Sequence, residues 1–188
     1  VCYYTVGGAE YDPFDFTDNS GLLKLTYQVD NGLETGTNLT TTLLGTQIPV
    51  GTTQSPTSLV TWRLYDTNGN VTASCTVTFT VYGNQPPQIV TVPNQTRDTD
   101  SGQPDYTIKT GDGWTPSVSD NCAVQLVTYQ IDSGTISGTG ASTDVIGEHL
   151  SPGIHTLIWV VTDIHGLTNT GTYQVTVTDN EPPLANCN

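Results

Sequence analysis

The 188-residue chain carries 4 Lys and Arg against 18 Asp and Glu, a formal net charge of −14. That charge repels phosphate backbones and anionic lipid headgroups, which argues against partners made of nucleic acid and against a membrane-surface role. No run approaches the ~18–20 consecutive apolar residues that a membrane span needs, so we expect no membrane insertion of this segment. Only 12% of the residues are charged. The polar remainder is rich in Thr, Ser, Asn and Gly, which are typical of solvent-facing strand positions and turns.

An internal repeat organises the sequence. Residues 17–32 read TDNSGLLKLTYQVDNG, and residues 119–134 return as SDNCAVQLVTYQIDSG. Two further blocks repeat later in the chain: residues 58–70 match 156–167, and residues 77–87 match 175–183. Self-similarity of this kind is the signature of homologous modules. We therefore predict module 1 over residues 1-85, module 2 over residues 86-183, and the start of a following repeat or linker over residues 184-188. The double proline Pro86-Pro87 is expected to act as a stiff connector.

Each module reads as short strands in chain order. Apolar and polar residues alternate with a period of two in LKLTYQV, SLVTWRLY and CTVTFTVY of module 1, and in LVTYQI and YQVTVT of module 2. Gly- and Asn-containing turns separate these runs, and no segment keeps a 3.6-residue apolar period, so we expect almost no helix. The predicted fold class is all-β, with two tandem immunoglobulin-like antiparallel β-sandwich domains. Trp62 and Trp159 occupy equivalent mid-strand positions and are predicted core residues.

Four motifs in module 2 resemble a known family. They are DSGQ at residues 100–103, WTPSVSDNC at 114–122, VVTDIHG at 160–166 and VTVTDNEPPLANC at 175–187. In this order they resemble the hyalin-repeat (HYR) modules, immunoglobulin-like domains that occur in tandem in extracellular proteins and large bacterial surface proteins. The resemblance implies a structural, extracellular role for this chain.

The four cysteines include no Cys-x-x-Cys pair, which favours disulfides over a zinc site and implies an oxidising extracellular setting. Cys2 opens the first predicted strand and Cys75 lies in the last strand of module 1. Because such strands can be neighbours in an immunoglobulin-like sandwich, we predict a Cys2–Cys75 disulfide. Cys122 and Cys187 are expected at opposite poles, too far apart for an intradomain bond. Either Cys187 pairs within a following module, or these two cysteines link different molecules.

Acidic turns are the remaining candidates for chemistry. Calcium takes six to eight oxygen ligands, which clustered carboxylates can supply. The candidate calcium ligands are Asp179 and Glu181 at the C-terminal boundary, Asp120 and Asp163 in two loops of one pole, and Asp98, Asp100 and Asp105 in the loop RDTDSGQPD. The competing interpretation is that these carboxylates only cap turns. No cofactor other than calcium is expected.

The sequence offers no nucleophile with a supporting base, and its three histidines form no ligand-spaced group, so we expect no enzyme. The leading hypothesis is a structural repeat segment, from the stalk or shaft of a large secreted or cell-surface adhesin, whose partners are flanking repeats. The ending TDNEPPLANCN repeats the boundary YGNQPP, and we read it as a cut within a longer protein. One alternative is a self-assembling filament subunit that binds further copies of itself. Another alternative is a module that binds carbohydrate or protein through its pole loops, the loops at the ends of the sandwich. The aromatic residues that crowd the N-terminal region of module 1 are Tyr3, Tyr4, Tyr11, Phe14 and Phe16.

Overall fold

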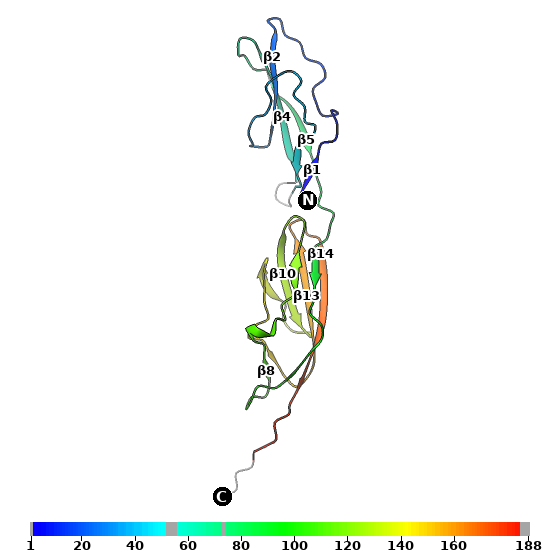
Figure 1. Cartoon of the computed structure of the whole chain (residues 1–188), viewed down its shortest axis with the longest axis vertical. Helices are drawn as coiled ribbons and strands as arrows, with labels where there is room; N and C mark the ends of the chain where they lie inside the picture. Colours follow the sequence, from blue (N-terminus) through cyan, green and yellow to red (C-terminus); the bar gives the residue numbers. More distant parts are fainter. Residues whose placement is uncertain (1, 52–55, 73, 185–188) are drawn as a thin grey trace. The chain divides into compact units, whose positions relative to one another are not determined.

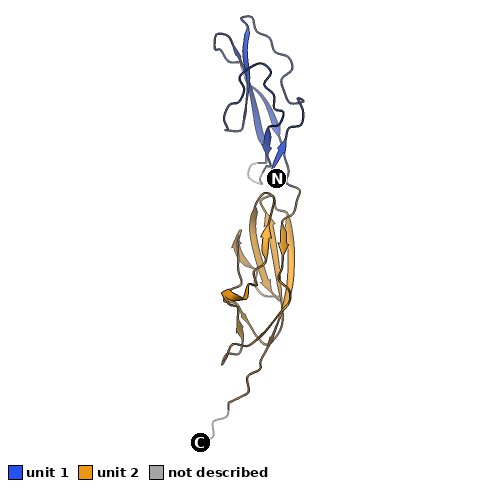
Figure 2. Cartoon of the chain, in the orientation of Figure 1, with its two compact units in different colours: residues 1–83 blue, residues 84–188 orange. Residues whose placement is uncertain are grey.

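The computed structural model describes residues 2–51, 56–72 and 74–184. The chain divides into two compact units, Val1–Gly83 and Asn84–Asn188, which Figure 2 colours separately. The predicted module boundary lies close to this division, after residue 85. Cys187 falls outside the described residues, and so does the predicted start of a following repeat from residue 185 onward.

The described part of unit 1 contains the strands β1 (Tyr3–Thr5), β2 (Leu22–Val29), β3 (Gln47–Pro49), β4 (Ser58–Asp66) and β5 (Cys75–Phe79). One antiparallel sheet has the order β2-β4-β5, and β1 pairs antiparallel with β3 (Figure 1). Burial alternates along β4, where every second residue from Ser58 to Asp66 is buried. The period of two in SLVTWRLY therefore predicted this strand correctly.

Unit 2 has more strands in its described part. They are β6 (Gln88–Val90), β7 (Gln95–Asp98), β8 (Tyr106–Thr107), β9 (Ser117–Ser119), β10 (Val124–Ile131), β11 (Ser137–Gly140), β12 (His149–Leu150), β13 (Gly153–Asp163) and β14 (Thr168–Thr178). The main sheet has the order β11-β10-β13-β14-β7, and two smaller sheets pair β12 with β8 and β6 with β9. Strand β7 runs parallel to β14, whereas the other pairings are antiparallel.

Each unit encloses its own hydrophobic core. In unit 1 the core joins Val6 and Ile48, from the β1-β3 side, to Val60, Trp62 and other residues of the β2-β4-β5 sheet. In unit 2 the core surrounds Trp159, which is fully buried. The prediction of two immunoglobulin-like β-sandwiches with tryptophan cores is confirmed. The described residues contain one short helical element, the 3-10 helix Thr110–Asp112, and none of their helices could span a membrane.

The repeat is also visible in the hydrogen bonds of equivalent turns. Asp30 and Asp132 follow β2 and β10, and both have positive φ values, 50° and 52°. The Oδ1 atom of Asp30 accepts the N–H of Leu59 at 2.7 Å, and Oδ1 of Asp132 accepts the N–H of Thr156 at 2.7 Å. Asp and Asn tolerate this left-handed conformation better than most residues because their short side chains bond the nearby backbone. The repeated sequence therefore specifies a repeated turn.

The predicted disulfide of unit 1 is wrong. Cys75 is a free, exposed thiol, while Cys2 and Cys122 are each disulfide-bonded. The reason lies in strand order. Cys2 precedes β1, which pairs with β3, whereas Cys75 opens β5, which pairs with β4, so the two cysteines belong to different sheets. A disulfide needs Cα atoms within about 7 Å, and strands of different sheets in a sandwich lie about 10 Å apart.

Candidate functional site

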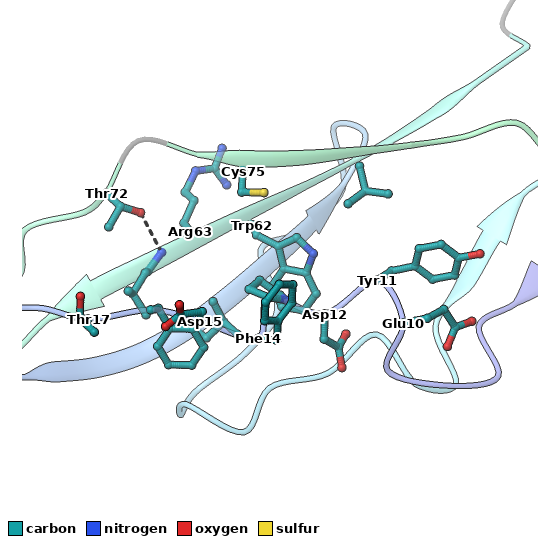
Figure 3. Close-up of a pocket in the computed structure, with 15 residues that line it drawn as sticks. Glu10, Tyr11, Asp12, Phe14, Asp15, Thr17, Trp62, Arg63, Thr72 and Cys75 are labelled. Carbon is teal, nitrogen blue, oxygen red and sulfur yellow. Dashed lines mark hydrogen bonds between the residues drawn. The ribbon is translucent and has the colours of Figure 1, made fainter.

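A cavity of about 550 Å³ opens beside the β2-β4-β5 sheet of unit 1 (Figure 3). Residues of the sheet line one side of it, among them Leu25, Trp62, Cys75 and Val77. The other side is formed by residues 10–17, a segment that has no strand structure. The cavity therefore lies where a covering segment crosses the sheet without pairing to it.

The walls of this cavity are mainly aromatic and aliphatic. Phe14 is 99% exposed, whereas Trp62 at the base is 2% exposed. Tyr11 packs edge-on against Phe79 with ring centroids 4.7 Å apart, and Phe16 packs partly buried against the core. Three of the five aromatic residues predicted to crowd this region thus line the cavity. Tyr3 and Tyr4 lie in β1 instead and are about 40% exposed, at 40% and 38%.

Two of the charged residues that line the cavity, Asp12 and Arg63, help to fix its walls. Asp12 accepts hydrogen bonds from the N–H of Leu43 at 2.9 Å and from Thr42 Oγ1 at 2.5 Å, which anchors the segment. Arg63 donates to Gln28 Oε1 at 3.1 Å and lies 3.8 Å from Glu34 Oε2. The slot is mainly apolar, although Glu10 and Asp15 also line it, and it contains the Cys75 thiol.

Two of the predicted calcium regions meet at one end of unit 2. We call their carboxylates the distal cluster: Asp98, Asp100, Asp105, Asp179 and Glu181. The carboxylate of Glu181 accepts the N–H of Gly102 at 2.8 and 3.0 Å, and Asn180 Nδ2 donates to Asp98 Oδ1 at 2.6 Å. No local pattern predicted that these two segments would lie together, because the residues that they join are 79 and 82 positions apart. The contacts fasten the C-terminal segment onto its own unit.

Protein donors already engage the distal cluster. Asp100 accepts Lys109 Nζ at 2.5 Å and the N–H of Thr107 at 3.0 Å, and these two hydrogen bonds hold the pKa of Asp100 below its ordinary value. Asp105 lies 3.2 Å from His149 Nδ1, and Asp179 accepts the N–H of Glu181 at 3.0 Å. A carboxylate oxygen that accepts an N–H has less capacity for a cation. The geometry of the distal cluster therefore fits turn capping.

The other predicted pair, Asp120 and Asp163, lies in neighbouring loops of unit 2. The loops are joined by a hydrogen bond from the N–H of Ile164 to the Ala123 carbonyl, at 3.2 Å. Oδ1 of Asp163 accepts two backbone N–H groups at 2.8 Å, and Oδ1 of Asp120 accepts two at 2.8 and 3.0 Å. Their Oδ2 atoms are buried and accept no hydrogen bond from the described residues, although His165 Nδ1 lies 3.5 Å from Asp163 Oδ2.

The equivalent pair in unit 1 is arranged differently. Ser20 donates to Asp18 Oδ2 at 2.6 Å and lies 3.3 Å from Asp66 Oδ2, so its hydroxyl bridges the two carboxylates. The residue at this position in unit 2 is Cys122, which has no hydroxyl. The Oδ2 atoms of Asp120 and Asp163 are left without the donor that their counterparts have. Among the described residues, no group of three or more His, Cys, Asp or Glu side chains is placed to hold a metal ion.

A scan of protein-family models gives no match to this sequence, and a search of curated proteins gives none either. Among solved structures, the chain is similar to the fibronectin(III)-like modules of Clostridium thermocellum CbhA, with 12% identity and a TM-score of 0.38. That alignment covers 92% of this chain and 88% of the other chain. The immunoglobulin-like fold assigned above follows from the sheets and cores themselves.

Proposed function

We propose that this chain is a non-enzymatic structural repeat segment of a large secreted or cell-surface protein, acting in the stalk or shaft of an adhesin. The observation that carries this proposal is the pairing of β7 with β14 in unit 2. β7 lies near the start of the unit and β14 near its end, and the two strands run parallel in the register Val175↔Gln95 to Thr178↔Asp98. A pull on the two ends of the unit loads all the hydrogen bonds of such a pair together, in shear. Antiparallel terminal strands would instead open one hydrogen bond at a time.

Three further features support a place outside the cell. Cys2 and Cys122 are disulfide-bonded, and disulfides persist in oxidising compartments. The chain has only four Lys and Arg, which offers few sites to trypsin-like proteases. The HYR-like motifs of unit 2 include turns that hold its frame, as Asp163 of VVTDIHG does by accepting the N–H groups of His165 and Leu167. We propose flanking repeats of the same protein as the partners of this segment.

Single-molecule force spectroscopy on the full chain, held at both ends, tests the load-bearing role. We expect unit 2 to unfold at a higher force than unit 1, because the described sheet of unit 1 has no strand in the position of β7. The N–H of Thr99 donates to the Thr178 carbonyl at 3.0 Å. The N–H of Thr99 therefore points toward β14. Because backbone N–H groups alternate in direction along a strand, the N–H of Gln95 also points toward β14, whereas the N–H of Thr96 points away from it.

This alternation supplies matched variants. Gln95→Pro removes a hydrogen bond of the parallel pair and is expected to lower the unfolding force of unit 2, while Thr96→Pro leaves that force nearly unchanged. Equal unfolding forces in both units, with neither proline having an effect, would contradict the load-bearing role.

A second candidate function is recognition of carbohydrate or protein, and the exposed Phe14 beside the cavity of unit 1 is the observation that favours it. Aromatic faces stack on apolar surfaces of ligands. A glycan array probed with the chain and with Phe14→Ala separates this function from a shaft. Glycan binding that Phe14→Ala abolishes would support recognition, and a chain that binds no glycan on the array would support the role in a shaft.

A further inference from the structure

The two repeats allow the outward sides of their main sheets to be compared residue by residue. The pairs Tyr27↔Trp62 and Tyr129↔Trp159 fix the equivalence of the two sheets. Side chains alternate along a strand, so the residues on either side of each core residue point away from the core. We call the outward side chains of β10, β13 and β14 the outer face of unit 2, and those of β2, β4 and β5 the outer face of unit 1 (Figure 1).

The outer face of unit 1 carries a charged network. Lys24 lies over the ring of Tyr65 at 4.4 Å, and Tyr65 donates its hydroxyl to Glu34 Oε1 at 2.8 Å. Glu34 also accepts the hydroxyl of Thr26, and the Arg63 guanidinium lies 3.8 Å from Glu34 Oε2. This face therefore presents charges of both signs, and the charges are paired with one another.

In unit 2 the positions of this network hold no charged residue. The equivalent positions lie at the same distance along the chain from the paired tyrosine and tryptophan of each sheet. The equivalent pairs are Lys24 and Leu126, Arg63 and Val160, Tyr65 and Thr162, and Glu34 and Ile136. Three of the four replacements in unit 2 are aliphatic, so the same face of the same frame has a different chemistry in the two repeats.

The whole outer face of unit 2 is uncharged, although the unit is strongly acidic. Unit 2 contains 11 Asp and Glu against 2 Lys and Arg, a net charge of −9. The outward positions within residues 126–130, 154–162 and 168–176 hold only Leu, Ile, Val, Thr and Gln. Ile136, beside β11, is 65% exposed, and Ile154, near the start of β13, is 66% exposed. An uncharged, partly apolar surface of this kind is typical of an interaction site.

Apolar side chains gather at the centre of this face, and threonines surround them. Ile158 and Val160 are successive outward residues of β13, and Leu126 lies on the neighbouring strand. Val160 has Thr128 opposite it on β10 and Thr170 opposite it on β14. A threonine hydroxyl both donates and accepts hydrogen bonds. An identical face can therefore match this one, because apolar groups meet apolar groups and each hydroxyl can take either role.

We propose that the outer face of unit 2 binds the same face of a second copy of this chain, sheet on sheet, about a two-fold axis. A two-fold contact brings the same patch of both copies together. In unit 2 this contact buries no charge, whereas in unit 1 it would remove the charged network from water at a cost in free energy. Sheets that pack in this way lie about 10 Å apart, with their strands within about 30° of each other.

A second copy fits this face better than a basic partner does. The acidic residues of unit 2 lie away from the outward positions of β10, β13 and β14. Electrostatic attraction would therefore guide a basic protein to other surfaces of the unit. Only a partner that is itself uncharged at the contact gains from this face, and a second copy supplies such a surface.

The contact is expected to be weak and reversible. Three strands about 4.8 Å apart, with about eight residues each at about 3.4 Å per residue, present roughly 400 Å². Two copies then bury about 800 Å², less than the roughly 1,200–2,000 Å² of stable complexes, so we expect a dissociation constant of about 10⁻⁴ M. The role of the contact in the cell rests on the proposed function: shafts built of such modules would associate side by side through many weak contacts acting together.

Sedimentation velocity of the full chain tests the dimer. The weight-average mass is expected to rise from 20.0 kDa toward twice that value between about 10 µM and about 1 mM protein, and to fall again on dilution. Added salt is expected to strengthen the dimer, because it screens the repulsion between two acidic units.

Two double variants locate the contact. Leu126→Lys with Val160→Arg gives unit 2 the residues that unit 1 holds at these positions, so the fold is expected to accept them and the dimer to weaken at least about tenfold. Val90→Arg with Ile146→Lys is the matched control. It adds the same charges at residues that are 66% and 48% exposed and lie outside β10, β13 and β14, and it is expected to dimerise as the wild type does. Circular dichroism confirms that both variants are folded.

Isoleucine methyl NMR gives an independent measure of the surface. The methyl signals of Ile136, Ile154 and Ile158 are expected to shift with protein concentration, while that of Ile146, exposed elsewhere on the unit, stays in place.

Four results would overturn the proposal. They are a chain that stays monomeric at about 1 mM, a dimer that both double variants weaken equally, a dimer that salt dissociates, and methyl shifts confined to residues off the outer face. None of these results alters the force difference expected from β7 and β14 in unit 2. Failure of this inference is therefore distinguishable from failure of the proposed function.

Discussion

The two units share one frame and differ in how the frame is closed. In unit 2, Trp114 is 2% exposed, packs against Tyr106 with ring centroids 5.6 Å apart, and lies under the Arg97 guanidinium at 5.2 Å. Asp112 holds this arrangement by accepting Tyr106 Oη at 2.6 Å. The corresponding side of unit 1 is the open cavity with the exposed Phe14. The repeated turns therefore specify the arrangement of the strands that the two units share. The residues before the first repeated block, which begins at Thr17 in unit 1 and at Ser119 in unit 2, determine how completely the core is covered.

The largest expected effect comes from the two equivalent tryptophans. Trp159→Ala removes a fully buried ring from a sealed core, so we expect it to lower the free energy of unfolding of unit 2 by about 3–5 kcal/mol. Trp62→Ala removes a ring that borders the open cavity, where water can enter the space, and is expected to cost unit 1 less. Hydrogen exchange with peptide-level mass spectrometry in urea reads each unit separately. Equal losses in the two units would show that the cavity does not distinguish them.

The next comparison concerns the aspartates that organise the turns after β4 and β13. Asp163 is 1% exposed and satisfies two backbone N–H groups, so Asp163→Ala leaves both unpaired in a buried place. We expect a loss of about 1–3 kcal/mol in the free energy of unfolding of unit 2. Asp66 is 9% exposed, and we expect Asp66→Ala to cost unit 1 less because water can reach its turn. Urea denaturation followed by circular dichroism measures both losses, and a larger loss for Asp66→Ala would contradict this account.

The sequence predicted these frames because their determinants are local. The alternating pattern of SLVTWRLY is sufficient to bury Trp62, and an aspartate beside a turn bonds the nearest N–H groups. The prediction of a Cys2–Cys75 disulfide failed because strand neighbours are fixed by long-range pairing. The cavity also escaped prediction, since no local pattern shows that residues 10–17 cross the sheet without pairing to it. The meeting of Glu181 with Gly102 had no local signal either.

Calcium binding is expected to distinguish the carboxylate pair of unit 2, Asp120 and Asp163, from the equivalent pair of unit 1, Asp18 and Asp66. Within the part of the chain that the structure describes, Oδ2 of Asp120 and Oδ2 of Asp163 accept no hydrogen bond, whereas Ser20 bridges the equivalent atoms of unit 1. We expect unit 2 alone to bind a calcium ion weakly, with the dissociation constant of about 10⁻⁴–10⁻³ M that is typical of extracellular modules. At about 1 mM calcium this affinity stabilises the unit by about 0.4–1.4 kcal/mol. Native mass spectrometry with and without chelator measures the stoichiometry.

Two variants locate the ion. Asp120→Asn is expected to abolish calcium binding, and Asp100→Asn, in the distal cluster, is expected to leave it unchanged because protein donors already engage Asp100. Calcium that disappears with Asp100→Asn would place the ion in the distal cluster instead. A wild-type chain that binds none would assign both groups of carboxylates to turn capping.

The smallest expected effect is a pH dependence that only unit 2 has. His155 Nδ1 lies 2.8 Å from Asp132 Oδ2 and its Nε2 lies 2.7 Å from the Ser151 carbonyl, whereas the residue equivalent to His155 in unit 1 is Ser58. Burial lowers the pKa of His155, but the two acceptors outweigh burial and raise that pKa above 6.5. Burial likewise raises the pKa of Asp132, but hydrogen bonds from the N–H of Thr156 and from His155 outweigh it and hold that pKa below 3.8.

The two shifts set a pH window. The contribution of His155 is complete below its unfolded pKa of about 6.5 and is lost as the pH rises through the higher folded value. The contribution of Asp132 is present above its unfolded pKa of about 3.9 and is lost as the pH falls through the lower folded value. We expect His155→Ser to destabilise unit 2 by a few tenths of a kcal/mol between these limits, and by less at alkaline pH. Urea denaturation of the wild-type chain and of His155→Ser across this pH range measures the difference between their free energies of unfolding. A difference that grows with rising pH would refute the ion pair of His155 with Asp132.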